Sequence, residues 1–135
     1  MNGSKDLEFM LENMSPEIIP GEYVFATVNE ETLEEFSESP LLTYREKEAI
    51  TVIVRKEVAD THALAYEDTW GLITLTVHSD LSAIGFLAEV TRVLAKAQLS
   101  VNVVSAFYHD HLFVPYERIH EAVRILVELC SVTEK

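Results

Sequence analysis

The sequence is poor in several residue types that mark particular classes of protein. It contains one cysteine, Cys130, and four glycines in 135 residues. A single cysteine excludes intramolecular disulfides and metal sites built from several thiolates. No Gly-x-Ser-x-Gly, Gly-x-x-x-x-Gly-Lys or His-Glu-x-x-His motif occurs, so three common catalytic or phosphate-binding arrangements are missing. We therefore predict no catalytic residues and no cofactor.

Basic residues are also scarce. The chain has 10 Lys and Arg against 23 Asp and Glu, giving a net charge of −13. The imbalance is concentrated in residues 1–69, which carry −11, whereas residues 70–135 carry −2. Because this charge repels phosphate backbones and no basic stripe is present, nucleic acid is excluded as a direct partner. The acidic run NEETLEEFSE, residues 29–38, is expected to be a solvated loop or short helix; docking of a basic partner is the alternative.

No apolar run approaches the roughly 18 residues that a membrane-spanning helix needs. The N-terminal stretch MNGSKDLEFMLENM lacks the basic start and apolar middle of a signal peptide. We therefore expect a cytoplasmic protein without a membrane partner. Hydrophobic residues make up 48% of the chain, enough to build a substantial core.

The second half of the chain has the clearer pattern. WGLITLTVHS alternates in polarity and predicts a strand over residues 71–78. A polar break follows, in which Ser82 or Asp80 is expected to cap a helix that continues to about residue 98. The predicted buried face of that helix contains Ile84, Leu87, Ala88, Thr91, Leu94 and Ala95.

The remainder of this half predicts strands over residues 101–107 and 111–115 and a final amphipathic helix. The apolar positions of that helix are Ile119, Ala122, Val123, Leu126 and Leu129. The resulting order is strand, helix, strand, strand, helix. This order predicts an α+β fold with the helices on one face of the sheet.

The first half repeats part of this order. Its pattern predicts a short helix at the N-terminus, a turn at Pro20-Gly21, strands over residues 22–28, 41–45 and 50–55, and a helix over residues 56–64. Helix, strand, strand, helix, the order that it shares with the second half, is that half without its first strand. We therefore expect an incomplete N-terminal unit, residues 1–69, and a C-terminal unit, residues 70–135. The strand at residues 71–78 is then available to both sheets.

The connection from Val77 to Gly85 is the candidate binding site. It delivers the chain to a helix N-terminus, where up to four amide groups lack partners within the helix and favour an anion such as a carboxylate. Gly85 permits close approach of a ligand. Asp80 is suited to an ammonium group, and His78 and Ser79 offer polar contacts. In the alternative interpretation, Ser82 and Asp80 only cap the helix and Gly85 only packs closely.

The histidines of FYHDHLFVPYE, residues 107–117, offer a second candidate. In a continuous strand, His109 and His111 point to the same face and form a possible metal pair, with His78 as the third ligand. The competing register turns through His109-Asp110, because an aspartate side chain can accept hydrogen bonds from nearby amides. We favour the turn and expect no metal site.

The segment GFLAEVTRVLAKAQLSVNVV resembles the ACT domain pattern, in which Gly-x-Leu-Ala-x-Val opens the first helix. The whole chain, including IIPGEYVF and YHDHLFVP, resembles small bacterial proteins built from two tandem ACT-like units. The resemblance implies a ferredoxin-like βαββαβ fold with an antiparallel sheet. The segment CSVTEK at the end of the chain leaves little room for a last strand. Gln98 stands where the family usually has the glycine that ends the first helix.

ACT domains typically act as regulatory sensors of amino acids, bound where two units meet. The resemblance therefore implies an amino-acid-binding regulatory protein that forms a homodimer or a higher homo-oligomer. The implied ligand-binding residues are His78, Ser79, Asp80, Ser82, Gly85, Ser100 and Asn102. The alternatives are a ligand-free module that mediates oligomerisation and a metal-dependent enzyme that uses His109 and His111. The sequence leaves open whether Tyr108 or His111 reaches the site.

Overall fold

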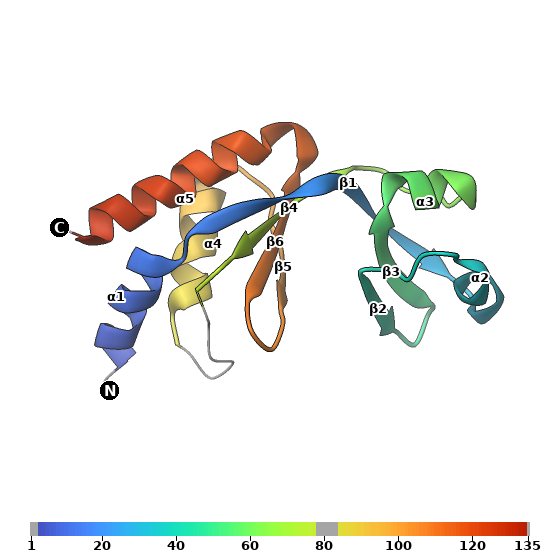
Figure 1. The fold of residues 1–135 in the computed structure, drawn as a ribbon, viewed down its shortest axis with the longest axis horizontal. Coiled ribbons are helices and arrows are strands. Elements are labelled where there is room, and N and C mark those ends of the chain that lie inside the picture. Colours follow the sequence, from blue (N-terminus) through green and yellow to red (C-terminus); the bar gives the residue numbers. More distant parts are fainter. Residues whose placement is uncertain (1–2, 78–83, 135) are drawn as a thin grey trace. The chain divides into compact units, whose positions relative to one another are not determined.

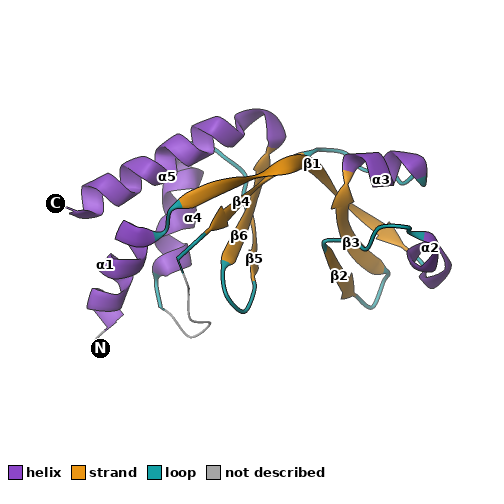
Figure 2. Ribbon diagram, viewed as in Figure 1, coloured by secondary structure: helices purple, strands orange, loops and turns teal. Residues whose placement is uncertain are grey.

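The computed structural model describes residues 3–77 and 84–134. The chain forms two compact units: unit 1 comprises Met1–Pro20 and Gly71–Lys135, and unit 2 comprises Gly21–Trp70. Each unit combines helices with strands, so the predicted α+β class is confirmed (Figures 1 and 2). In the part of the chain that is described, no helix is long and apolar enough to span a bilayer.

Unit 1 contains the elements that surround the predicted binding site. They are α1 (Gly3–Asn13), the start of β1 (Pro16–Val28), β4 (Trp70–Leu75), α4 (Phe86–Lys96), β5 (Asn102–Ser105), β6 (Asp110–Pro115), the 3-10 helix η1 (Tyr116–Arg118) and α5 (Ile119–Glu134). The order strand, helix, strand, strand, helix after residue 69 is therefore confirmed.

The strands of unit 1 are hydrogen-bonded in the order β1-β4-β6-β5. The start of β1 thus supplies the strand that a βαββαβ unit would otherwise place after its second helix. The second helix of that βαββαβ order, α5, continues to Glu134, which is the last described residue. The hydrogen bond from the Thr76 amide to the Met14 carbonyl, 2.8 Å, ties the chain before β1 to the end of β4.

The core of unit 1 lies between the sheet and its helices. Ile73 and Leu75 of β4 and Leu112 and Val114 of β6 alternate along their strands, so they share one face of the sheet. They pack with buried residues of the three helices: Met10 and Leu11 of α1, Phe86, Val90 and Leu94 of α4, and Ala122 and Leu126 of α5. The predicted positions of α5 are confirmed, since Ile119, Ala122 and Leu126 are buried.

The predicted buried face of α4 is wrong in part. Phe86, Val90 and Leu94 are buried, whereas the side chain of Ile84 is 82% exposed and Ala88 and Ala95 are exposed. The reason is the start of the helix. Its first residue is Phe86 and its N-cap is Gly85, with φ 89°, so the expected N-cap at Ser82 or Asp80 is wrong and Ile84 precedes the helix.

Unit 2 contains the rest of β1, α2 (Glu30–Glu35), β2 (Leu42–Arg45), β3 (Ile50–Arg55) and α3 (Lys56–Thr61). Its strands are antiparallel in the order β2-β3-β1, with Tyr23 opposite Arg55 and Leu42 opposite Ile53. Its core is made of buried residues from β1, β3 and α3, namely Val24, Ala26, Val28, Ile50, Val52, Val54 and Ala59. The acidic run contains the short helix α2, which buries none of its residues and is capped by the Asn29 side chain.

The turn predicted at Pro20-Gly21 is wrong, because both residues lie inside β1. Gly21 has φ 123°, a conformation that residues with a side chain rarely adopt. A Cβ atom at Gly21 would also lie 3.2 Å from the ring of Tyr23. The pair therefore marks the point at which β1 leaves unit 1 and enters unit 2. The boundary at residue 69/70 and the sharing of strand 71–78 stay predictions.

The two units end corresponding helices in the same way. After α4, the amide of Gln98 donates to the Ala95 carbonyl (2.8 Å) and that of Leu99 to the Leu94 carbonyl (3.0 Å). After α3, the amide of Ala63 donates to Asp60 (3.2 Å) and that of Leu64 to Ala59 (2.9 Å). Both sets form the Schellman motif, which needs a left-handed residue after the C-cap. Gln98 has φ 59° and Ala63 has φ 52°.

Candidate functional site

The predicted binding residues separate into three groups in the structure. His78, Ser79, Asp80 and Ser82 lie outside the described residues. Gly85 is half-buried at the start of α4. Ser100 and Asn102 are exposed, one before β5 and one at its first position.

Ser100 and Asn102 do not lie near Gly85. They follow the C-terminal end of α4, and Gly85 precedes its N-terminal end. The 11-residue helix between these positions is about 16 Å long. The structure therefore does not unite all the described members of the predicted site.

Gly85 leaves the N-terminus of α4 without a side-chain cap. The first turn therefore presents backbone amides that no side chain of an N-cap residue satisfies, at the positive end of the helix dipole. A Cβ atom at Gly85 would meet only the side chain of Leu7, at 3.6 Å. The positive φ, rather than lack of space, is therefore what favours glycine here.

The hairpin of β5 and β6 borders this end of unit 1. Its turn is closed by the hydrogen bond from the Ala106 amide to the His109 carbonyl, 3.0 Å, and Phe107 and Tyr108 are exposed at its tip. The predicted turn through His109-Asp110 is therefore wrong by about two residues. Asp110 already belongs to β6, opposite Ser105, because the antiparallel ladder continues to that pair. Figure 1 shows that this turn and the start of α4 lie at the same end of unit 1.

Each histidine of the hairpin contacts β4 or its extension. Nδ1 of His109 lies 3.2 Å from the carbonyl oxygen of Val77, and because a carbonyl only accepts, His109 donates this hydrogen bond. Nδ1 of His111 lies 2.9 Å from Oγ1 of Thr74. His109 is therefore the residue that reaches the end of β4, where the predicted binding connection begins.

The two histidine rings lie 6.5 Å apart, centre to centre. Among residues 3–77 and 84–134, no group of three or more His, Cys, Asp or Glu side chains is placed to hold a metal ion. The third ligand considered from the sequence, His78, lies outside the described residues.

The environment of His111 lowers its pKa below the ordinary value. Burial is the largest cause, the charge of His109 acts in the same direction, and Asp110 acts in the opposite direction. A histidine of lowered pKa contributes stability above its unfolded pKa of about 6.5, and this contribution is lost as the pH falls through the folded pKa.

We therefore expect acidification from about pH 7.5 to 5.5 to destabilise the protein in part through His111. Urea unfolding at a series of pH values should show a smaller loss of stability for His111→Gln than for the unmodified chain. His120→Gln, at an exposed position on α5, serves as the control. An unchanged pH dependence in His111→Gln would contradict the assignment.

Asp110 is the charged residue most completely removed from solvent among those described. Asp110 is 4% exposed, and its Oδ2 atom is buried without a hydrogen-bond partner. The sequence assigned Asp110 to a turn, and nothing in the local pattern indicated its burial. Its position became apparent only from the register of β5 and β6.

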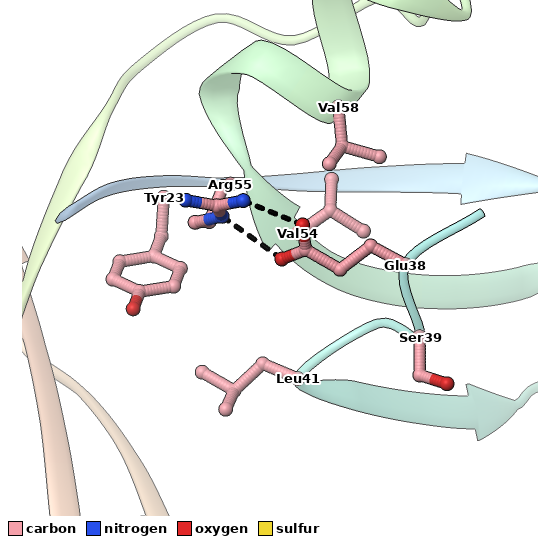
Figure 3. A pocket seen from close by; sticks show the side chains of 7 residues that line it. All are labelled: Tyr23, Glu38, Ser39, Leu41, Val54, Arg55 and Val58. Atoms are coloured by element: carbon pink, nitrogen blue, oxygen red, sulfur yellow. Dashed lines mark hydrogen bonds and ion pairs between the residues drawn. The ribbon is translucent and has the colours of Figure 1, made fainter. Parts of the chain in front are cut away.

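Unit 2 contains a pocket of about 110 Å³ that the sequence did not indicate (Figure 3). It is lined by Tyr23, Glu38, Ser39, Leu41, Val54, Arg55 and Val58. Nε of Arg55 donates to Oε1 of Glu38 at 2.9 Å and Nη2 donates to Oε2, so the hydrogen bonds from Arg55 lower the pKa of Glu38. Burial raises the pKa of Tyr23. Because the guanidinium and carboxylate neutralise each other, this pocket offers a ligand little uncompensated charge.

Comparison with protein-family models gives two matches along this chain. Residues 2–70 match one ACT domain model, and residues 66–128 match another. The chain belongs to the ACT domain family. Its two tandem ACT domains agree with the resemblance drawn from the segment that begins at Gly85. The search of curated proteins found no match.

Three solved structures have folds similar to that of this chain. A Vibrio cholerae protein of unknown function, described as a possible transport protein, is 39% identical, with a TM-score of 0.84 over 96% of this chain and 99% of that chain. The regulatory subunit of aspartate kinase from Thermus thermophilus is 9% identical, with a TM-score of 0.66 over 87% and 97% of the two chains. E. coli aspartokinase III, solved with aspartate and ADP, is 14% identical, with a TM-score of 0.62 over 84% of this chain and 32% of that chain. The last two show a shared fold alone.

Proposed function

We propose that this ACT protein is a non-catalytic regulatory sensor of an amino acid or a similar small zwitterion. The ligand binds at the connection from β4 to α4, and binding changes the assembly of a cytoplasmic homo-oligomer. The observation that carries the proposal is the N-terminus of α4, which follows a glycine N-cap with φ 89° and has no side-chain cap. Such a terminus favours a carboxylate.

The regulatory subunits that share this fold support a sensor function. E. coli aspartokinase III was solved with the amino acid aspartate and with ADP. This ACT chain contains the regulatory type of fold, and its two family matches occupy most of its length. A separate sensor that passes its signal to another protein or to another copy is therefore the function that fits best.

The test is a thermal-shift screen of the full chain against the twenty common L-amino acids. An amino acid present at about 100 times its dissociation constant should stabilise the protein by about 2.7 kcal/mol. The double variant His78→Ala, Asp80→Ala should lose the shift, whereas Glu117→Gln, at an exposed position, should retain it. Absence of a shift with every amino acid at millimolar concentration would count against the proposal.

A second candidate is a ligand-free module that mediates oligomerisation. Phe107 is 69% exposed and Tyr108 63% exposed at the tip of the hairpin, and β5 is the last strand in the sheet order of unit 1. Exposed aromatic side chains beside a sheet edge favour association. Sedimentation analysis separates the two candidates, because the sensor changes mass with its amino acid and the module does not.

A further inference from the structure

Asp110 lies on the face of the sheet that carries the helices. It precedes Leu112 and Val114 by two and four residues in β6, and these two residues pack with Phe86, Val90 and Leu94 of α4. Since side chains alternate between faces along a strand, Asp110 shares the face of Leu112 and Val114.

Asp110 also lies at the end of the sheet where α4 begins. It pairs with Ser105 at the turn end of the hairpin. The neighbouring His109 contacts the carbonyl of Val77 beyond the end of β4. The β5–β6 turn and the first residues of α4 are at the same end of unit 1 (Figure 1). Asp110 is therefore on the helix-covered face of the sheet, at the end where α4 begins.

A buried carboxylate without a partner is costly. Removing an ionised carboxylate from water costs several kcal/mol unless a charge or hydrogen bonds compensate it. Almost all buried polar atoms in folded proteins have a hydrogen-bond partner. Oδ2 of Asp110 has none, although the Asp110 residue is only 4% exposed. The missing partner must be a hydrogen-bond donor and, for the largest compensation, a cation.

The first amides of α4 and the Asp110 carboxylate, both at this end of unit 1, favour ligand groups of opposite charge. The first amides of α4, which receive no cap from the N-cap residue Gly85, favour an anion, and Asp110 favours a donor such as an ammonium group. A free α-amino acid carries both groups on one carbon atom. A simple amine or a simple carboxylic acid would satisfy only one side of the site.

We propose that Asp110 binds the ammonium group of the amino acid whose carboxylate lies at the first amides of α4. This inference rests on the proposed function and identifies the residue that distinguishes a free amino acid from other small acids. The sequence suggested Asp80 for this role, and the two assignments make different predictions.

The first experiment measures binding with matched ligands. Each L-amino acid that shifts the melting temperature is compared with the 2-hydroxy acid that has the same side chain, such as L-alanine with L-lactate. The unmodified protein should prefer the amino acid. Asp110→Asn should bind that amino acid at least about tenfold more weakly and lose most of the preference, because a neutral amide cannot form the charged hydrogen bond.

Two variants serve as comparisons. Asp68→Asn, at an exposed position of unit 2, should bind as the unmodified chain does. Asp80→Asn tests the competing assignment. If Asp80→Asn removes the preference for the amino acid and Asp110→Asn retains it, the inference is overturned while the proposed function stands. If no amino acid binds the unmodified protein, both fail.

The second experiment needs no ligand. Asp110→Asn preserves the shape of the side chain and removes its charge, so the ligand-free variant should melt at least about 3 °C above the unmodified protein. A lower melting temperature would show that the carboxylate has a structural partner, which overturns the inference. A higher melting temperature together with weaker amino-acid binding is the result expected of a binding residue.

Discussion

Replacing Phe86 with alanine should destabilise unit 1 by about 3–5 kcal/mol, the usual cost of truncating a fully buried phenylalanine. Phe86 is the first residue of α4 and is 2% exposed within the core formed with β4, β6, α1 and α5. Removing its ring leaves a cavity and loosens the attachment of the helix N-terminus to the sheet. Urea unfolding followed by far-ultraviolet circular dichroism measures the effect.

Ile84 provides the control for this substitution. It lies two residues earlier and is 82% exposed, so Ile84→Ala should change the stability by less than about 0.5 kcal/mol. The sequence pattern assigned Ile84 to the buried face, so it predicts the reverse order of effects. Equal losses in the two variants would mean that α4 does not begin at Phe86.

Replacing Gln98 with glycine should stabilise the protein by about 1 kcal/mol. Gln98 has φ 59° in the Schellman motif after α4, a conformation that costs a residue with a side chain about 1–2 kcal/mol and glycine very little. Part of this gain is offset because glycine has more conformational freedom in the unfolded chain. The same urea experiment measures the change.

The corresponding position of unit 2 supplies an independent comparison. Ala63→Gly, with φ 52° in the same motif after α3, should also stabilise the protein. Gln98→Ala should give no comparable gain, because alanine retains the Cβ atom that causes the strain. If Gln98→Ala were as stabilising as Gln98→Gly, loss of the glutamine side chain rather than the backbone conformation would be responsible.

Most secondary structure was predictable because apolar spacing determines it locally. The alternation of residues 72–75 indicated β4, and the spacing of Ile119, Ala122 and Leu126 indicated α5. Predictions of element boundaries failed where a glycine with positive φ or the pairing register of two strands decided where an element begins or ends. Gly85 delays the start of α4 past Ser82, and Gly21 allows β1 to continue through Pro20 instead of turning.

Of the candidate site, the sequence indicated the helix N-terminus that follows it. The spacing from Val77 to Gly85 indicated a helix N-terminus after a strand, and the structure has α4 begin directly after Gly85. Ser100 and Asn102, carried over from the family pattern, lie beyond the other end of the helix. The burial of Asp110 and the contact of His109 with Val77 were not predictable, because both depend on pairing between β5, β6 and the extension of β4.

The sequence alone determined the family, the α+β class and the acidic net charge, since these follow from motif, hydrophobic period and composition. Tertiary structure decided which residues meet. The start of β1 completes the strand order of unit 1, a long-range pairing that has no local signal. Asp110 is buried on the helix-covered face of the sheet because the cross-strand register assigns it there, although its sequence neighbours indicate a turn.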